Sequence, residues 1–238
     1  MAEVIRKGAA TDDVLSDVEK TLRNARARGG TWQSAAEEKL GAVERLAALV
    51  TTRLAAAEQE YEPLKAALDA EDDVADDFLG GVSDDIWNKV GRPGSDPVLS
   101  IMFPTGISYY TDGSDEEQPE RMDLLAELLG QGLHPRLDAA TSATHASSVR
   151  AAAERYRRKV DALRGPAARV RLLSAMKTAI GRYAQTELAN LKRRYKSDSH
   201  SEADIHSVIP AHTRAAPKTE AEPTPPAPVP VTNPVTPR

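Results

Sequence analysis

The fold is decided by residues 36–68, AEEKLGAVERLAALVTTRLAAAEQEYEPLKAAL, in which apolar side chains recur at alternating intervals of three and four residues. This is the spacing of a heptad seam, along which one helix packs lengthwise against another. The stretch therefore predicts a long helix with a partner. The seam positions are Ala36, Leu40, Val43, Ala47, Val50, Leu54, Ala57, Tyr61, Leu64 and Leu68.

A second seam of the same kind lies far downstream and can supply the partner helix. Since one chain carries both seams, the economical arrangement is an antiparallel pair that closes around the intervening segment, and an intermolecular coiled coil is the alternative. The positions of this seam are Ala146, Val149, Ala153, Tyr156, Val160, Leu163, Ala167 and Val170, continuing through Leu173, Met176, Ile180 and Tyr183.

Proline interrupts both seams. Pro63 removes one backbone donor from the first, so a kink or a break is expected near residues 57–62. Gly165 and Pro166 interrupt the second seam in the same way and predict a bend there.

The chain is expected to be all-α and elongated: an antiparallel helical pair, coiled-coil-like, with a small helical and loop cap and a disordered Pro-rich C-terminal tail. Apolar spacing that ends at a glycine pair predicts the N-terminal helix, and nine of the sixteen prolines fall from Pro210 onwards, a composition that cannot form a core. The expected segments are the N-terminal helix at 1–30, the first long helix at 31–70, the acidic, aromatic-containing cap at 71–138, the basic return helix at 139–196 and the tail at 197–238.

The cap contains the stretch IMFPTGISYYTDG at residues 101–113, which is dense in aromatic side chains and turn formers. Asp96 and Pro97 predict an N-cap and a first helical residue, and a hairpin around the Pro-Thr-Gly turn is the competing interpretation. We expect the aromatic residues to form the core of the cap. Tyr109 or Tyr110 is the candidate for an exposed partner surface, so Phe103→Ala is predicted to cost more stability than Tyr110→Ala.

Composition limits the classes of function. Hydrophobic residues make up 40% of the chain but aromatic residues only 4%, which argues against a large compact core, and the absence of cysteine excludes disulfides and thiolate sites. No signal-peptide pattern and no membrane-spanning stretch occurs, so we expect a cytoplasmic protein without a membrane partner. No nucleotide-binding, nucleophile or zinc-protease motif occurs either. We therefore predict no catalytic residue, no cofactor and no metal site.

The net charge of −5 hides two opposite blocks. Residues 72–138 hold fifteen acidic and four basic side chains, and residues 150–196 hold fourteen basic and three acidic ones. The two blocks either face each other within the chain or leave a basic surface for a polyanion. The candidate polyanion contacts are Arg155, Arg157, Arg158, Lys159, Lys192, Arg193 and Arg194.

These patterns favour a non-catalytic structural or protein-interaction protein, a helical scaffold or spacer with a flexible tail that binds a protein partner or copies of itself. A nucleic-acid-associated protein that uses the basic return helix is the alternative, and an enzyme with a site in the cap is the third option. The histidines are expected to be structural, because His200, His206 and His212 lack the spacing that places ligands on one helix face.

Overall fold

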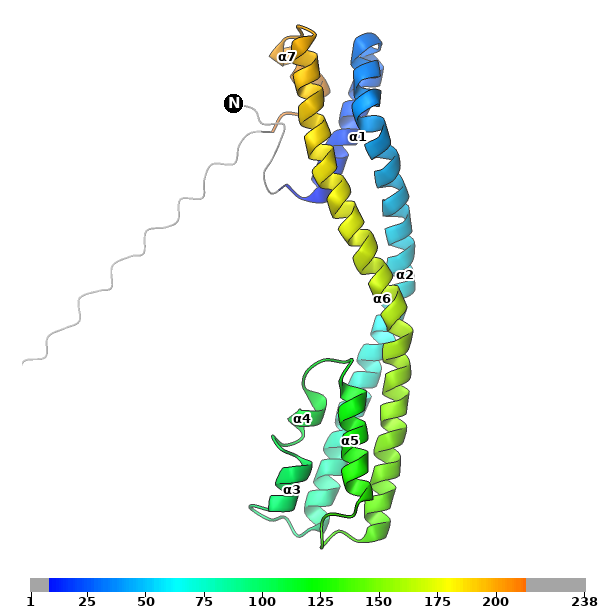
Figure 1. The fold of residues 1–238 in the computed structure, drawn as a ribbon, viewed down its shortest axis with the longest axis vertical. Helices are drawn as coiled ribbons and strands as arrows, with labels where there is room; N and C mark the ends of the chain where they lie inside the picture. Colours follow the sequence, from blue (N-terminus) through cyan, green and yellow to red (C-terminus); the bar gives the residue numbers. More distant parts are fainter. Residues whose placement is uncertain (1–8, 213–238) are drawn as a thin grey trace, which may run out of the picture.

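The computed structural model describes residues 9–212, and every regular element within that range is a helix (Figure 1). The elements are α1 (Thr11–Arg28), α2 (Gly30–Lys89), α3 (Pro97–Met102), α4 (Ser108–Thr111), α5 (Gln118–Gly130), α6 (Ala139–Ser197) and α7 (Glu202–Val208). None of these helices is long and apolar enough to span a membrane.

An antiparallel pair of two long helices forms the body of the molecule. Helix α2 has 60 residues and α6 has 59, so each is about 90 Å long at 1.5 Å per residue. The seam of α2 is buried along this pair, for example at Leu40, Val50 and Leu54. The predicted antiparallel helical pair is therefore confirmed.

Both long helices continue through their prolines, so the expected break near residues 57–62 is wrong. Proline removes a single backbone hydrogen bond, and the packing of α2 against α6 offsets that loss. Glu60 and Arg169 form an ion pair between the two helices, at 2.5 Å. Pro63 follows Glu60 by three residues and Pro166 precedes Arg169 by three, so the antiparallel register places the two prolines at the same level.

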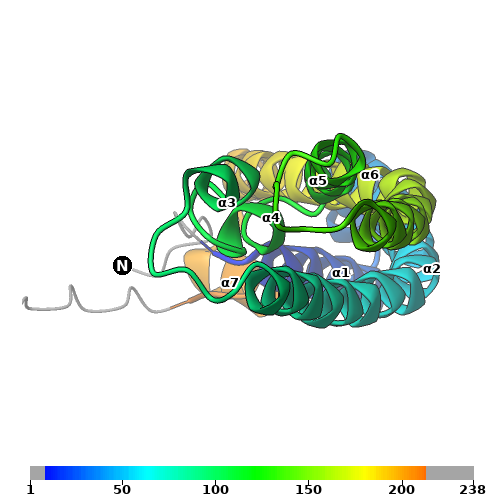
Figure 2. The same ribbon diagram turned by 90° about the horizontal axis from the view of Figure 1, so that it is seen from below.

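The cap is built at the loop end of the pair by α3, α4, α5 and the adjoining parts of α2 and α6 (Figure 2). Asp96 caps α3 by accepting hydrogen bonds from the backbone N–H groups of Val98 and Leu99, and Pro97 is its first residue. The predicted helix is thus correct and the hairpin is not. Helix α2 reaches Lys89, well beyond the expected boundary at residue 70, because Leu79, Val82 and Ile86 extend its apolar face into the cap.

At the opposite end, α1 and α7 pack on the start of α2 and the end of α6; we call this the α1–α7 end. Its core contains Leu22, Leu40, Leu191 and Tyr195. Ile205 is also fully buried, so the tail predicted from residue 197 is wrong for residues 202–208, which form a short amphipathic helix. The rest of the predicted tail, residues 213–238, lies outside the described residues.

Between the two ends is a narrow waist, which we define as residues 50–63 of α2 and 166–176 of α6. In the described part of the chain only these two helices cross it, and its core is Val50, Leu54, Ala57 and Leu173. The second predicted seam is wrong at two positions just beside this core: Met176 and Tyr183 are exposed. Ile180 of the predicted seam does pack inward, and from Ala184 onwards the buried positions of α6 are Ala184, Leu188, Leu191 and Tyr195, in the core that α1 shares.

Candidate functional site

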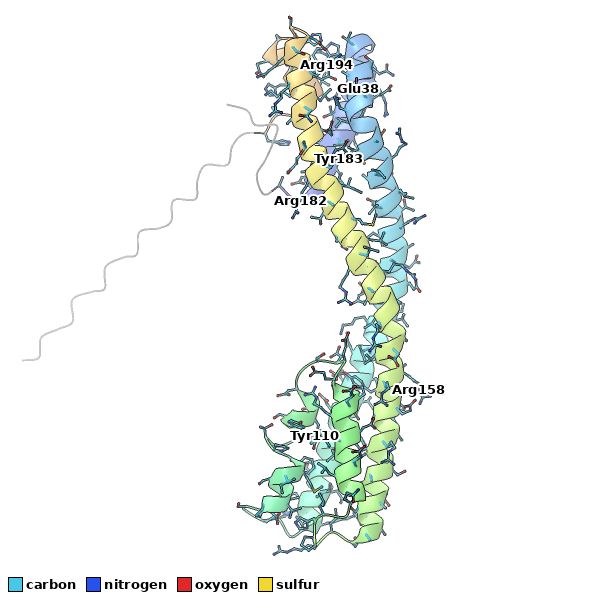
Figure 3. All side chains as sticks on the ribbon, viewed as in Figure 1. Glu38, Tyr110, Arg158, Arg182, Tyr183 and Arg194 are labelled. Carbon is cyan, nitrogen blue, oxygen red and sulfur yellow. The ribbon has the colours of Figure 1, made fainter. Side chains whose placement is uncertain are left out.

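The aromatic stretch of the cap is a corner of the fold. Tyr110 of α4 is fully buried in the cap (Figure 3) and donates its hydroxyl hydrogen to the backbone oxygen of Met102. Its ring packs edge-on against Phe103 and Tyr109. Burial raises the pKa of the Tyr110 phenol to about 12. The prediction of Tyr110 as a partner surface is therefore wrong, since none of its side chain reaches solvent.

Tyr109 is half-buried and retains an accessible edge. Its backbone oxygen accepts a hydrogen bond from Arg121 Nη1 at 3.1 Å, and the same guanidinium bonds the backbone oxygen of Asp112. Arg121 thus ties the end of the aromatic stretch to α5. Tyr109 remains a candidate contact, at the rim of a rigid corner.

A shallow pocket of about 340 Å³ lies beside α3, between the end of α2 and the loop that follows it. Trp87 and Phe103 supply its aromatic surface, and Asp84 and Asp96 are its ionisable residues. Asp96 is already engaged as the cap of α3 and as the partner of His134, at 3.1 Å. The pocket therefore offers an aromatic contact surface with one free carboxylate.

A partly buried polar cluster joins the cap to the helical pair. The Tyr156 hydroxyl of α6 donates to Asp72 of α2 at 2.8 Å, and Gln118 of α5 donates to Asp76 at 3.0 Å. Burial, and then the charge of Asp72, raises the pKa of the Asp76 carboxyl. Burial and the bond to Asp72 raise the pKa of the Tyr156 phenol. These contacts cross-link three helices, α2, α5 and α6.

The candidate polyanion contacts are distributed around α6 and do not form one surface. Several are held by neighbouring acids within the chain: Arg155 by Glu71 at 3.2 Å, Arg157 by Asp123 at 2.5 Å, and Lys192 by Glu202 at 3.2 Å. Of these pairs only Arg157–Asp123 joins the two charge blocks, because Glu71 and Glu202 lie outside residues 72–138.

The remaining candidates are exposed to different degrees. Arg158 and Arg194 pair with Glu154 and Asp198 of their own helix, at 3.9 and 3.3 Å, and Arg193 donates to Asn190. Lys159 is half-buried and has no ion pair with a described residue.

A different set of arginines does share one face of α6, the side turned away from α2. Their spacing is seven, seven, seven, eleven and eleven residues, and steps of seven or eleven return a helix to within about 20° of the same direction. Three of them, Arg150, Arg171 and Arg182, have no ion pair with a described residue. This spacing is visible in the sequence and could have identified the face. The arginine row consists of Arg150, Arg157, Arg164, Arg171, Arg182 and Arg193.

The described histidines occupy structural positions. His200 stacks on Trp32 with ring centroids 3.9 Å apart, His145 bonds Asp85 at 2.8 Å, and His212 bonds Asp17 at 2.7 Å. Among residues 9–212 no group of three or more histidine or acidic side chains has the arrangement of a metal site.

Comparison with known proteins identifies no relative. No protein-family model, no curated protein and no solved structure matches this chain.

Proposed function

We propose that this chain is a non-catalytic interaction protein, a helical spacer that holds two separately packed ends apart. One observation carries the proposal: two hydrophobic clusters lie at opposite ends of one helical pair, joined by a waist with four buried core residues. A waist of only two helices lengthens the molecule while burying few apolar side chains, and such a shape suits a protein that connects two partners. A cytoplasmic location is part of this proposal.

The two ends also differ in what they expose, which supports different partners. The cap exposes apolar side chains such as Trp87 and Ile101 around its shallow pocket. The α1–α7 end exposes charged side chains, among them Glu38 and Arg193. A spacer with unlike ends would connect one partner that binds through apolar contacts to another that binds through charges.

The experiment is affinity capture with the full chain and two variants. Ile101→Asp alters the cap, whereas the double variant Glu38→Arg with Arg193→Glu alters the α1–α7 end without changing the net charge. Each variant should lose a different captured protein and keep the other. If both variants retain every protein captured by the unaltered chain, or if both lose the same one, the spacer proposal fails.

A second candidate function, association with nucleic acid, is favoured by the arginine row. A guanidinium group can donate two parallel hydrogen bonds to one phosphate group. Three members of the row, Arg150, Arg171 and Arg182, have no competing partner among residues 9–212. The test is the mobility of random-sequence duplex DNA and RNA at low and high salt. Arg171→Glu with Arg182→Glu should remove salt-sensitive binding, whereas Arg158→Glu with Lys159→Glu, an equal charge change off the row, should not. Equal effects of the two variants would count against this function.

A further inference from the structure

An apolar row lies on α6 and α2 on the side opposite α1, and nothing among residues 9–212 covers it. Helix α1 contacts α6 at Lys177 and Gly181. The row occupies the other edge of the pair, and Tyr183, which belongs to it, projects from the upper half of α6, clear of the cap (Figure 3). The row consists of Leu46, Leu49, Leu172, Met176 and Tyr183, with relative exposures from 44% to 61%.

The row is continuous across the two helices. The contact of the Tyr195 hydroxyl with the Trp32 oxygen, at 2.7 Å, and the Glu60–Arg169 pair set the antiparallel register. This register places Leu46 level with Tyr183. On α6 the members Leu172, Met176 and Tyr183 are spaced four and seven residues apart, with exposed Ala179 completing a 4-3-4 pattern. That is the spacing of a second seam, separate from the one that faces α2.

The size of the row matches half of a symmetric interface. Five half-exposed large side chains leave on the order of 400–500 Å² of apolar surface, the size of the largest patch on a typical monomer, which is often functional. Two such surfaces in contact, with their polar rims, reach the roughly 1,200 Å² at which stable interfaces begin.

We propose that this row binds the same row of a second copy of the chain, with the two α6 helices antiparallel. Leu172 and Tyr183 lie at the ends of the α6 pattern and small Ala179 lies between them. In two antiparallel copies, Leu172 of one copy therefore lies against Tyr183 of the other. The small side chain of Ala179, near the centre of the contact, lets the two α6 backbones approach each other. Exposed Ala168 and Ala175 flank the row and leave room for that approach.

Charges near the row give the contact a distinct salt dependence. Arg171 and Arg182 are exposed on its outer flank, and the antiparallel arrangement brings these arginines of the two copies toward each other. Arg53 lies on the α2 side, where its apolar stem can cover the row and its charge can reach the rim. Because the contact is apolar with like charges beside it, added salt should leave association unchanged or strengthen it. Nucleic-acid binding by the arginine row should instead become weaker as salt is added.

The chain contains no cysteine, which allows a crosslinking test with the full-length protein. With Leu172 against Tyr183, the two-fold axis lies between residues 177 and 178 and Ala179 of one copy lies beside Met176 of the other. The two Ala179 residues are then offset by only about three residues along the helices, so Ala179→Cys should form a disulfide-linked dimer on mild oxidation. Ala175→Cys is the matched control: it lies four residues earlier on the same helix and is also exposed, but it faces the outer flank. Crosslinking of Ala175→Cys at the same rate or faster would overturn the proposed geometry.

Light scattering after size exclusion, from micromolar to near-millimolar protein, measures the association itself. The unaltered chain should be dimeric at the upper concentrations, and Met176→Glu should be at least tenfold weaker in association with an unchanged helical circular dichroism spectrum. Leu133→Glu changes an equally exposed apolar residue of the cap and should leave the dimer intact. A strict monomer throughout, a dimer that Met176→Glu does not weaken, or a dimer that salt dissociates would overturn the proposal. The spacer proposal is tested separately, because partner capture at the two ends does not involve this row.

Discussion

Thr11, the first residue of α1, lies directly against Gly181 of α6: a Cβ atom at position 181 would be 2.8 Å from Thr11 Cγ2. The missing side chain thus lets the start of α1 rest on the long helical pair.

Substitutions at two helical glycines test this contact. Gly81 of α2 has nothing within 4 Å of an added Cβ, so Gly81→Ala should raise the free energy of unfolding by about 0.5–1 kcal/mol through helix propensity. Gly181→Ala should lack this gain or be destabilising, because the methyl group displaces Thr11. Thr11→Ser removes Cγ2 and should restore the gain in the double variant. Equal stabilisation by the two glycine substitutions, measured by urea unfolding, would show that α1 does not depend on this contact.

The structure reverses the predicted order of two aromatic residues in the cap. Tyr110 is fully buried whereas Phe103 is half-buried, so Tyr110→Ala should cost about 3–5 kcal/mol of stability and Phe103→Ala clearly less. Tyr110→Phe keeps the ring and loses only the hydrogen bond to Met102, at a cost of about 0.5–1.5 kcal/mol. Thermal and denaturant unfolding measure all three. A larger cost for Phe103→Ala would contradict the described core of the cap.

Helix α7 should contribute to the stability of the α1–α7 end. Ile205 is 0% exposed and Ile101, in the cap, is 62% exposed. Ile205→Ala should therefore destabilise by about 2–4 kcal/mol, whereas Ile101→Ala should change stability by less than about 0.5 kcal/mol. Hydrogen exchange should also show faster exchange in α1 when Ile205 is shortened. Near-equal effects of the two isoleucines would mean that α7 is not docked in solution.

The raised pKa of Asp76 predicts a pH dependence of stability. A carboxyl whose pKa is higher in the folded state than in the unfolded chain destabilises the folded state once pH rises above both values. Asp76→Asn should therefore be more stable than the unaltered chain at neutral pH, since the amide oxygen can still accept from Gln118. The difference should shrink as pH falls below about 4, where the carboxyl is protonated in both states. A constant difference across this range would rule out titration of Asp76 as its cause.

Much of the architecture follows from local patterns. The seam of α2, the glycines after α1 and the Asp96–Pro97 start of α3 all depend on residues near in sequence, and the structure confirms each. A break at Pro63 does not occur because burial along a long partner helix outweighs one lost hydrogen bond. Met176 and Tyr183 were predicted to face α2, because their spacing fits the seam toward α2 and the exposed apolar row equally well. Only the position of α1, a contact with a distant segment, decides between the two seams.

The candidate surfaces show the same limit. Tyr109 and Tyr110 are adjacent and chemically identical, so the sequence does not distinguish them, and only the fold of the cap places the Tyr110 hydroxyl against the Met102 oxygen in the core. Charges adjacent in sequence, such as Arg157 and Arg158, point to different sides of α6. The arginine row can be found from the sequence because its members are spaced seven or eleven residues apart.

The coincidence of Pro63 and Pro166 gives the molecule a single mechanical joint. Both helices lack a backbone donor at one level, in the section with the smallest apolar core, so resistance to bending is lowest there. The two ends are therefore stiff arms on either side of the one level at which bending costs least.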